Sequence, residues 1–336
     1  MWGDSEQTGP VQNNSPPAPI ARAVLVGAGL VGRSWAIVFA RAGVEAVLHD
    51  PFPEVGAAAM EKLKSSLIEL EEHGLLADWR AVLGRVRFDG DLSSALAGAD
   101  WIQESAPESL EVKRKLFTEL DAKAPPGAII ASSTSGFSPS AFTEHVAGRE
   151  RTLVAHPVNP PHLAPLVEIV PAPWTDPGIA KRAGAIMEAL DQKPILVRKE
   201  IDGFVLNRIQ GVVLDEAFRL VQEGYVSVED VDRAMVYGLA TRWSFMGPFE
   251  TIDLNAPGGI KDYVERYREM YHRFAAARSS DAKPWDPEAV SAVEADRRNA
   301  LPLEKISERS GWRDRVLMRI AAQRAHLNGG SDSGSR

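Results

Sequence analysis

Short runs of apolar and β-branched residues alternate with helix-like stretches between residues 20 and 200. The apolar runs are 23-AVLVG, 46-AVLHD, 85-RVRF, 101-WIQES, 128-AIIASS, 152-TLVAH and 195-ILVR. The helical patterns between them cover residues 54–74, 93–98, 108–123 and 178–190. Because strands that alternate with helices form parallel sheets, this order predicts an α/β fold with a mostly parallel, doubly wound sheet.

The strand patterns disappear after residue 201. Helical patterns follow at residues 202–223, 227–237, 259–277, 287–299 and 312–327. Asp202, and Ser227 with Asp230 three residues later, are suited to cap the first two of these helices. We therefore expect an α/β domain at residues 20–200 and an all-helical C-terminal domain at residues 201–328. The polar ends, residues 1–19 and 329–336, are predicted to be disordered tails.

The overall composition argues against several classes of binding partner and of site. The chain has 336 residues, a formal net charge of −8 and no cysteine. A net negative charge argues against nucleic acid or an anionic membrane surface as the main partner. Without cysteine, disulfides and thiolate metal ligands are excluded, and the scattered histidines give no support to a metal site. No apolar run reaches the roughly 20 residues that span a bilayer, and no signal peptide is evident, so we expect a cytoplasmic protein.

A glycine loop follows the first apolar run. The segment 27-GAGLVG-32 matches G-x-G-x-x-G at a strand-to-helix turn. The first glycine allows the tight turn, the second lets a pyrophosphate approach the backbone, and the third lets helix and strand pack closely. We assign the residues of this loop to cofactor binding in a Rossmann-type domain: Gly27, Gly29, Leu30, Val31 and Gly32.

Asp50 completes the dinucleotide pattern. It follows the second apolar run, close to the expected ~20 residues after the last glycine. Its carboxylate would accept hydrogen bonds from both ribose hydroxyls and would repel a 2′-phosphate. No Arg or Lys lies within the next ten residues. The sequence therefore favours NAD over NADP. The alternative is a turn without a ligand, in which Asp50 is only a cap.

Polar side chains stand at the ends of several other predicted strands. They are the 132-SSTS-135 cluster, His156 and Glu104. Ligands of open α/β sheets bind at the carboxyl ends of strands. Each group also has a structural interpretation, because Ser/Thr clusters often form turns or caps and single histidines are often structural.

Glu168 lies alone between two apolar residues. An unpaired buried carboxylate is costly, so Glu168 needs a partner, and His156 is the nearest plausible one. A carboxylate that accepts a hydrogen bond from one imidazole nitrogen fixes the tautomer and raises the basicity of the other nitrogen. With a nicotinamide cofactor, such a pair is suited to oxidation of an alcohol.

Asn207 and Gly211 interrupt the apolar face of the helix predicted at residues 202–223. That face otherwise carries apolar residues at the spacing of one helical stripe. Asn207 is either a structural amide between helices or an amide directed into an active cleft, with Gly211 leaving space beside it.

Several motifs occur together and in a fixed order: GAGLVGRSWA, SSTSGF, AHPVNPP, LVEIVP, DGFVLNR and GPFETIDLN. Together they resemble the 3-hydroxyacyl-CoA dehydrogenase superfamily over about residues 22–327. The resemblance is closer to its lambda-crystallin branch, which includes L-gulonate 3-dehydrogenase, through HPVNPP, 238-GLATRWSFMGPFETIDLN-255 and 312-WRDRVLMRIA. It implies an NAD-dependent oxidoreductase with a helical domain that binds substrate and forms a homodimer.

The resemblance implies a catalytic set. His156 would be the general base that takes the proton of the substrate hydroxyl, and Glu168 would be its partner. Ser135 and Asn207 would hydrogen-bond the substrate oxygen.

The resemblance also implies further cofactor contacts. Glu108 and Lys113, in PESLEVK, match positions at the nicotinamide ribose, and Asn159 matches an asparagine beside the cofactor and substrate. Ser133 is also assigned to cofactor binding: the superfamily commonly has asparagine at this position, and the closer branch has serine, as here.

Two features bear on the substrate. CoA-using relatives carry a lysine-rich hairpin after the second strand, whereas residues 54–80 here hold six acidic and three basic residues. This segment is poorly suited to CoA phosphates, unless CoA is held elsewhere. Arg242 precedes a Gly-Pro turn and would hold a small carboxylate, or else form an interdomain ion pair. We therefore expect a free 3-hydroxy acid, with L-gulonate first and carnitine or 3-hydroxybutyrate as neighbouring possibilities.

Three alternatives stay open. The first is an L-3-hydroxyacyl-CoA dehydrogenase with the same catalytic residues. The second is a non-catalytic, crystallin-like structural protein, against which an intact Ser135, His156, Glu168 and Asn207 set argues. The third is an NAD-binding regulatory module.

Overall fold

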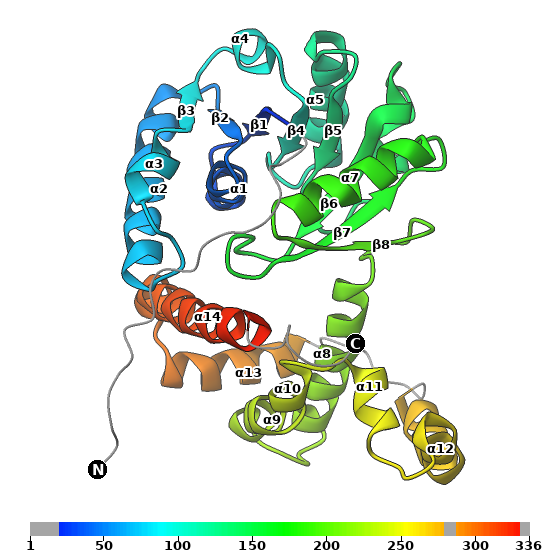
Figure 1. Cartoon of the computed structure of the whole chain (residues 1–336). Helices are drawn as coiled ribbons and strands as arrows, with labels where there is room; N and C mark the ends of the chain where they lie inside the picture. Colours follow the sequence, from blue (N-terminus) through cyan, green and yellow to red (C-terminus); the bar gives the residue numbers. More distant parts are fainter. Residues whose placement is uncertain (1–19, 279–286, 330–336) are drawn as a thin grey trace. The chain divides into compact units, whose positions relative to one another are not determined.

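The computed structural model describes residues 20–278 and 287–329 (Figure 1). The described residues form two compact units: residues 20–207 with 310–329, and residues 208–278 with 287–309. The predicted tails lie outside the described residues, except for residue 329 at the end of the last helix. The domain boundaries expected from the sequence stay a prediction.

The first unit contains one eight-stranded sheet, ordered β3-β2-β1-β4-β5-β6-β7-β8 (Figure 1). Its strands are β1 Arg22–Val26, β2 Glu45–His49, β3 Val86–Asp89, β4 Trp101–Glu104, β5 Ile129–Ser132, β6 Thr152–Pro157, β7 Leu166–Pro171 and β8 Lys193–Leu196. All neighbours pair in parallel except β6 and β7. The fold class predicted from the sequence, an α/β fold with a doubly wound sheet followed by a helical region, is confirmed.

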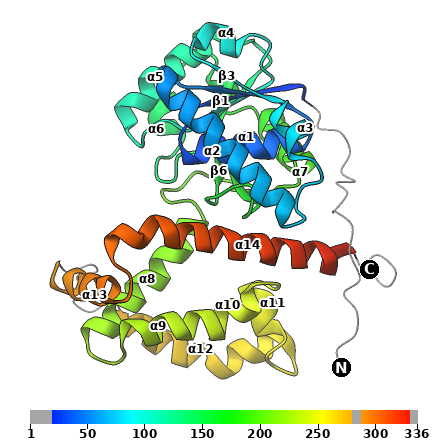
Figure 2. The ribbon, with the colours of Figure 1, turned by 90° about the vertical axis from the view of Figure 1, so that its left-hand side faces the viewer.

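Helices cover both faces of this sheet (Figure 2). They are α1 Leu30–Arg41, α2 Pro53–Glu72, α3 Trp79–Leu83, α4 Leu92–Leu96, α5 Leu110–Lys123, α6 Ser140–Thr143, η1 Arg149–Arg151 and α7 Pro177–Ala189. One hydrophobic cluster joins β-strand side chains such as Leu25 to α1, α2 and α7. The other joins alternate side chains such as Val24 to α4, α5 and α6. This alternation follows from the two-residue period of a strand that is buried on both faces.

Strand β7 was not among the predicted strands. Its sequence, LVEIVP, is bounded by prolines and contains a glutamate, and both features weaken a strand pattern. In the structure β7 pairs antiparallel with β6, so the end of β6 lies beside the start of β7.

The second unit is helical. It contains most of α8 Leu206–Gln222, then α9 Val228–Ala234, the π-helix η2 Met235–Leu239, α10 Ala240–Trp243, α11 Pro248–Asp253, α12 Gly259–Arg278, α13 Pro287–Ala300 and η3 Leu303–Lys305. The predicted Ser227 cap is confirmed, because its hydroxyl accepts the Asp230 N–H at 3.1 Å.

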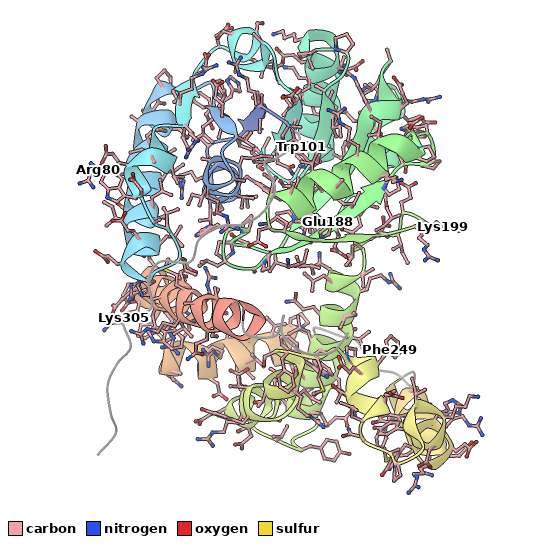
Figure 3. The ribbon with its side chains drawn as sticks, viewed as in Figure 1. Arg80, Trp101, Glu188, Lys199, Phe249 and Lys305 are labelled. Carbon is pink, nitrogen blue, oxygen red and sulfur yellow. The ribbon has the colours of Figure 1, made fainter. Side chains whose placement is uncertain are left out.

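The two units differ in how exposed their large apolar side chains are. Trp101 of β4 is fully buried in the first unit, whereas Phe249 of α11 in the second unit is 75% exposed (both labelled in Figure 3). No residue of α8 is buried, although its apolar residues form a stripe. The last helix, α14 Ile306–Gly329, contributes Met318 to the core of the first unit.

Candidate active site

The glycine loop adopts a shape that only glycine permits. Gly27 has a φ of 105°, and a Cβ atom there would lie 2.6 Å from the Ser105 carbonyl oxygen. A Cβ atom on Gly32 would lie 1.9 Å from the Gly27 carbonyl oxygen. At Gly29, by contrast, no atom lies within 4 Å of the Cβ position, and no side chain caps the start of α1 there. The loop thus leaves open space and unpaired N–H groups beside a helix N-terminus, as a bound pyrophosphate requires.

Asp50 is hydrogen-bonded to the backbone of this loop. One carboxylate oxygen accepts the Ala28 N–H at 3.2 Å and the other accepts the Phe52 N–H at 3.2 Å. Each oxygen keeps a second acceptor position. The carboxylate is therefore both a brace for the turn and a partner for ribose hydroxyls, so the cap interpretation and the cofactor interpretation are compatible.

His156 and Glu168 lie directly opposite each other on the antiparallel strands β6 and β7. Nδ1 of His156 is 2.7 Å from Oε2 of Glu168. Glu168 is completely buried. Because a carboxylate accepts and does not donate, the proton of this hydrogen bond is on Nδ1, and Nε2 is left as an acceptor. The two side chains that the sequence paired are thus in contact.

The second oxygen of Glu168 stabilises the start of α8. Oε1 accepts the N–H groups of Val205 at 2.8 Å and of Leu206 at 3.1 Å. Burial alone would raise the pKa of Glu168, but the hydrogen bonds from His156 and from these two N–H groups hold the pKa below its ordinary value. The carboxylate is therefore kept charged while it is fully buried.

The predicted Asp202 cap differs from what the structure shows. Helix α8 begins at Leu206, four residues later, and Asp202 accepts a hydrogen bond from the Ser138 hydroxyl at 2.9 Å. Between them, Phe204 has a positive φ of 49° and is completely buried, with its ring 5.5 Å from the His156 ring. A local pattern could not reveal a cap that comes from a strand almost 40 residues earlier.

Asn207 and Ser135 are joined directly. The Asn207 side-chain amide donates to the Ser135 carbonyl oxygen at 2.8 Å. Asn207 follows the Leu206 N–H that binds Glu168, so the start of α8 connects Ser135 to the His156–Glu168 pair. The structure thus brings together all four residues of the predicted catalytic set.

Glu108 holds the turn that carries Ser135. One of its oxygens accepts from the Thr134 hydroxyl and from the N–H groups of Ser135 at 3.2 Å and Gly136 at 3.3 Å. Its other oxygen is 3.2 Å from the ammonium of Lys113. Burial would raise the pKa of Glu108, but Thr134 and Lys113 lower it below its ordinary value. Two residues assigned to the cofactor therefore also support the turn at Ser135.

Other predicted residues lie in different settings. The Ser133 hydroxyl already has partners in Trp35, Gln103 and Ser105, at 2.7–3.2 Å. Asn159 is exposed in the segment after β6. Arg242 lies on α10 in the second unit, immediately after the π-helix. Local π-helical turns are frequent at functional sites, so the position of Arg242 is compatible with a role in binding.

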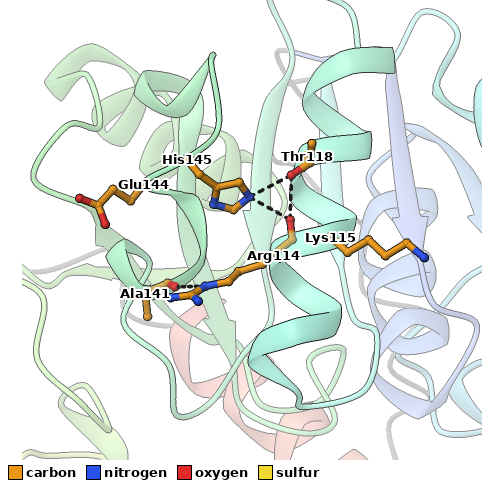
Figure 4. A pocket seen from close by; sticks show the side chains of 6 residues that line it. All are labelled: Arg114, Lys115, Thr118, Ala141, Glu144 and His145. Carbon is orange, nitrogen blue, oxygen red and sulfur yellow. Dashed lines mark hydrogen bonds between the residues drawn. The ribbon is translucent and has the colours of Figure 1, made fainter.

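A shallow hollow between α5 and α6 contains none of these residues. It is lined by Arg114, Lys115, Thr118, Ala141, Glu144 and His145 (Figure 4). Arg114 donates to the Ala141 carbonyl oxygen at 2.8 Å, and His145 contacts the Thr118 hydroxyl at 2.9 Å. Several of its polar groups thus bind one another.

Within residues 20–278 and 287–329, no group of three or more His, Asp or Glu side chains is placed to hold a metal ion. Over the same part of the chain, no helix is long and apolar enough to cross a membrane.

Comparisons with known proteins show what the chain is similar to. Residues 22–201 match the model of the 3-hydroxyacyl-CoA dehydrogenase NAD binding domain, and residues 203–301 match the C-terminal domain of the same family. The chain is 40% identical to rabbit (Oryctolagus cuniculus) lambda-crystallin over 303 residues, which covers 89% of this chain and 94% of that protein. It is 34% identical to a 3-hydroxyacyl-CoA dehydrogenase of Gibberella moniliformis over 312 residues, 92% of this chain and 96% of that one.

A solved structure is also similar over nearly the whole chain. It is 5-formyl-3-hydroxy-2-methylpyridine 4-carboxylic acid 5-dehydrogenase, an NAD⁺-dependent dismutase. The TM-score is 0.78 at 25% identity, with 92% of this chain and 99% of that one covered.

Proposed function

The chain belongs to the 3-hydroxyacyl-CoA dehydrogenase family and is an NAD-dependent oxidoreductase, and on that premise we propose that it oxidises the C3 hydroxyl of a small, free 3-hydroxy acid. The observation that carries this proposal is the 2.7 Å contact between His156 and a buried, charged Glu168. When bound, NAD⁺ accepts the hydride from the alcohol carbon.

His156 acts as the general base in this proposal. Its Nδ1 proton is held by Glu168, so Nε2 takes the proton of the substrate hydroxyl. As positive charge develops on the imidazole, the Glu168 carboxylate stabilises it. The backbone N–H groups of Val205 and Leu206, at the start of α8, keep the carboxylate from rotating. The Ser135 hydroxyl and the Asn207 amide hold the substrate oxygen beside Nε2.

The residues for the cofactor fit NAD. The open N-terminus of α1 at Gly29 would hold the pyrophosphate, and Asp50 would accept from the ribose hydroxyls. Glu108, Lys113 and Asn159 would lie at the nicotinamide end. Ser133 fits less well as a direct cofactor contact, because its hydroxyl already has three partners. We propose that it stabilises the residues around the site through these hydrogen bonds.

A free acid is favoured over a CoA ester by charge. Helix α2, in the place where CoA-using relatives have a lysine-rich hairpin, carries five of the six acidic residues of segment 54–80. Arg242 offers a planar guanidinium that can bind a carboxylate with two hydrogen bonds. A similar solved structure is named for a free carboxylic acid. L-gulonate is the first candidate, and L-3-hydroxyacyl-CoA is the second because of the similarity to the Gibberella protein.

The test is NADH formation from L-gulonate, L-3-hydroxybutyrate, L-carnitine and L-3-hydroxybutyryl-CoA, each with NAD and with NADP. Arg242→Met should raise KM for the free acid about 10- to 100-fold, since a hydrogen bond to a charged group contributes about 1.5–3 kcal/mol. Arg242→Lys, which keeps the charge but not the paired geometry, should fall between. Turnover of the CoA ester alone, insensitive to Arg242→Met, would overturn the free-acid proposal.

We also propose that the protein is a homodimer through its helical unit. Among the described residues of this unit, five large apolar side chains are at least 68% exposed: Tyr225, Tyr237, Phe245, Phe249 and Leu254. Exposed apolar side chains in such number are typical of a surface that another protein covers. Light scattering should give twice the chain mass for the wild type, and Tyr237→Glu with Phe249→Glu should give a monomer. A wild-type monomer would contradict this.

A further inference from the structure

Glu104 stands at the point where the strand order of the sheet reverses. Strand β4, which it ends, pairs with β1 on one side and with β5 on the other, and Glu104 lies level with Val26 and Ser132. The chain runs outward from β1 to β2 and β3, and in the opposite direction from β4 onward. Ligands of open α/β sheets bind in the crevice at such a reversal. The next residue, Ser105, contacts the Gly27 turn closely.

All the acceptor capacity of Glu104 is used within the protein. The residue is completely buried. Each of its oxygens is 3.1 Å from Nζ of Lys113. One oxygen also accepts the Ala106 N–H at 2.8 Å, and the other accepts from the Ser132 hydroxyl. Glu104 is therefore a fixed anion whose position is determined by four donor contacts from three elements of the fold.

Lys113 connects this buried anion to the surface of the site. Its side chain is 1% exposed, and its ammonium also lies 3.2 Å from Glu108, whose side chain is 43% exposed. The three donors of the ammonium thus go to two carboxylates. Since Glu104 balances the charge of Lys113, the cluster keeps one net negative charge, on the half-exposed Glu108.

A buried ion pair is not needed for stability alone, because apolar side chains of similar size are often as stabilising in its place. Here the pair is connected through Lys113 to Glu108, which holds the turn at residues 134–136 through three hydrogen bonds. If Glu104 were neutral, the Lys113 ammonium would be attracted to Glu108 alone. Lys113 would then compete with the turn at residues 134–136 for the Glu108 carboxylate.

We propose that Glu104 is a positioning residue for NAD binding, which acts by fixing Lys113 and, through it, Glu108. This rests on the proposed function, in which Lys113 and Glu108 lie at the nicotinamide ribose. Glu104 does not touch the cofactor itself.

The experiment measures the Kd of NAD with the full-length protein and no substrate, by titration calorimetry. Glu104→Gln should weaken binding about 10-fold or more, in line with the loss of one charged hydrogen bond. Lys113→Met should weaken it at least as much. If Glu104 acts through Lys113, the double variant should bind no more weakly than Lys113→Met alone. Additive losses, or a wild-type Kd for Glu104→Gln, would overturn the proposal.

A matched control separates positioning from general destabilisation. Asp121, on the same helix α5, pairs with Arg151 at 2.6 Å, and both side chains are mostly buried. Asp121→Asn should lower Tm and leave the Kd of NAD unchanged, whereas Glu104→Gln should change Kd beyond any loss of Tm. Should Glu104→Gln not fold, Glu104→Asp keeps the charge and moves the carboxylate by one bond, and it too should raise Kd.

These results are distinguishable from failure of the proposed function. The Kd measurement involves no substrate, so a wrong substrate or a wrong general base would leave it unaffected. If Lys113→Met and Glu108→Gln both bound NAD as the wild type does, the placement of these residues at the cofactor would be wrong, and the role of Glu104 would fall with it.

Discussion

Two buried carboxylates lie in the same sheet, Glu104 as the last residue of β4 and Glu168 within β7. Both are completely buried, and each contacts a basic residue type, Lys113 at 3.1 Å and His156 at 2.7 Å. The partners differ in kind. Lysine is a residue type that keeps its charge at neutral pH, whereas an imidazole gains or loses a proton there. In the proposed function, a buried carboxylate of the sheet therefore fixes geometry in one place and supports proton transfer in the other.

The largest effect should come from removing the proton acceptor. His156→Gln keeps a polar side chain of similar reach but cannot take the substrate proton. We expect kcat to fall about 10²- to 10⁴-fold, the usual contribution of a general base, while NAD still binds. The matched control is His162→Gln in the same segment, which should keep its kcat. Equal losses in both variants would mean that this comparison reflects folding and not proton transfer.

The next effect tests the carboxylate of the same pair. Glu168→Gln leaves a side chain that can still accept from Nδ1 but carries no charge to stabilise the protonated imidazole. We expect kcat to fall about 10- to 100-fold, corresponding to about 1.5–3 kcal/mol, with the Kd of NAD little changed. Glu104→Gln should show the reverse, a weaker Kd with a smaller change in kcat at saturating NAD. If the two variants had the same profile, the division between the two carboxylates would be wrong.

Much of this arrangement could be predicted from the sequence because its signals are local. The glycine loop, Asp50 and the strand-helix alternation are short-range patterns, and each predicts the same fold. Glu168 was informative for a different reason: an isolated carboxylate in an apolar run has to find a partner. The His156 contact is present in the structure, while the catalytic roles of these residues stay predictions.

The remainder depends on contacts between distant residues. Glu168 caps α8 across 37 and 38 residues, so no pattern near Asp202 could show that the helix begins at Leu206. Glu104 was noticed as a polar strand end, but its partner Lys113 lies inside the next helix. Strand β7 was missed because its stability comes from pairing with β6 and β8 and not from its own prolines and glutamate.

The smallest effect concerns a histidine without a carboxylate partner. His162 lies six residues after His156, and among the described residues its Nδ1 has no hydrogen-bond partner. Burial, with a further contribution from the Arg41 guanidinium, lowers the pKa of His162 to about 3. Arg41 donates to the His162 carbonyl oxygen at 2.9 Å, so the cation is held close. His162 therefore shows what burial does to an imidazole that lacks a partner such as Glu168.

The lowered pKa of His162 determines how the free energy of unfolding depends on pH. Below about pH 6.5 the unfolded chain protonates His162 and the folded chain does not, so the free energy of unfolding falls as the pH falls, by up to about 1.4 kcal/mol per pH unit. His162→Gln should remove this slope. Urea unfolding at pH 7, 6 and 5 should show the wild type losing stability faster than the variant, whatever their difference at pH 7. Parallel loss in both proteins would show that His162 takes up its proton in the folded state, which would contradict the lowered pKa.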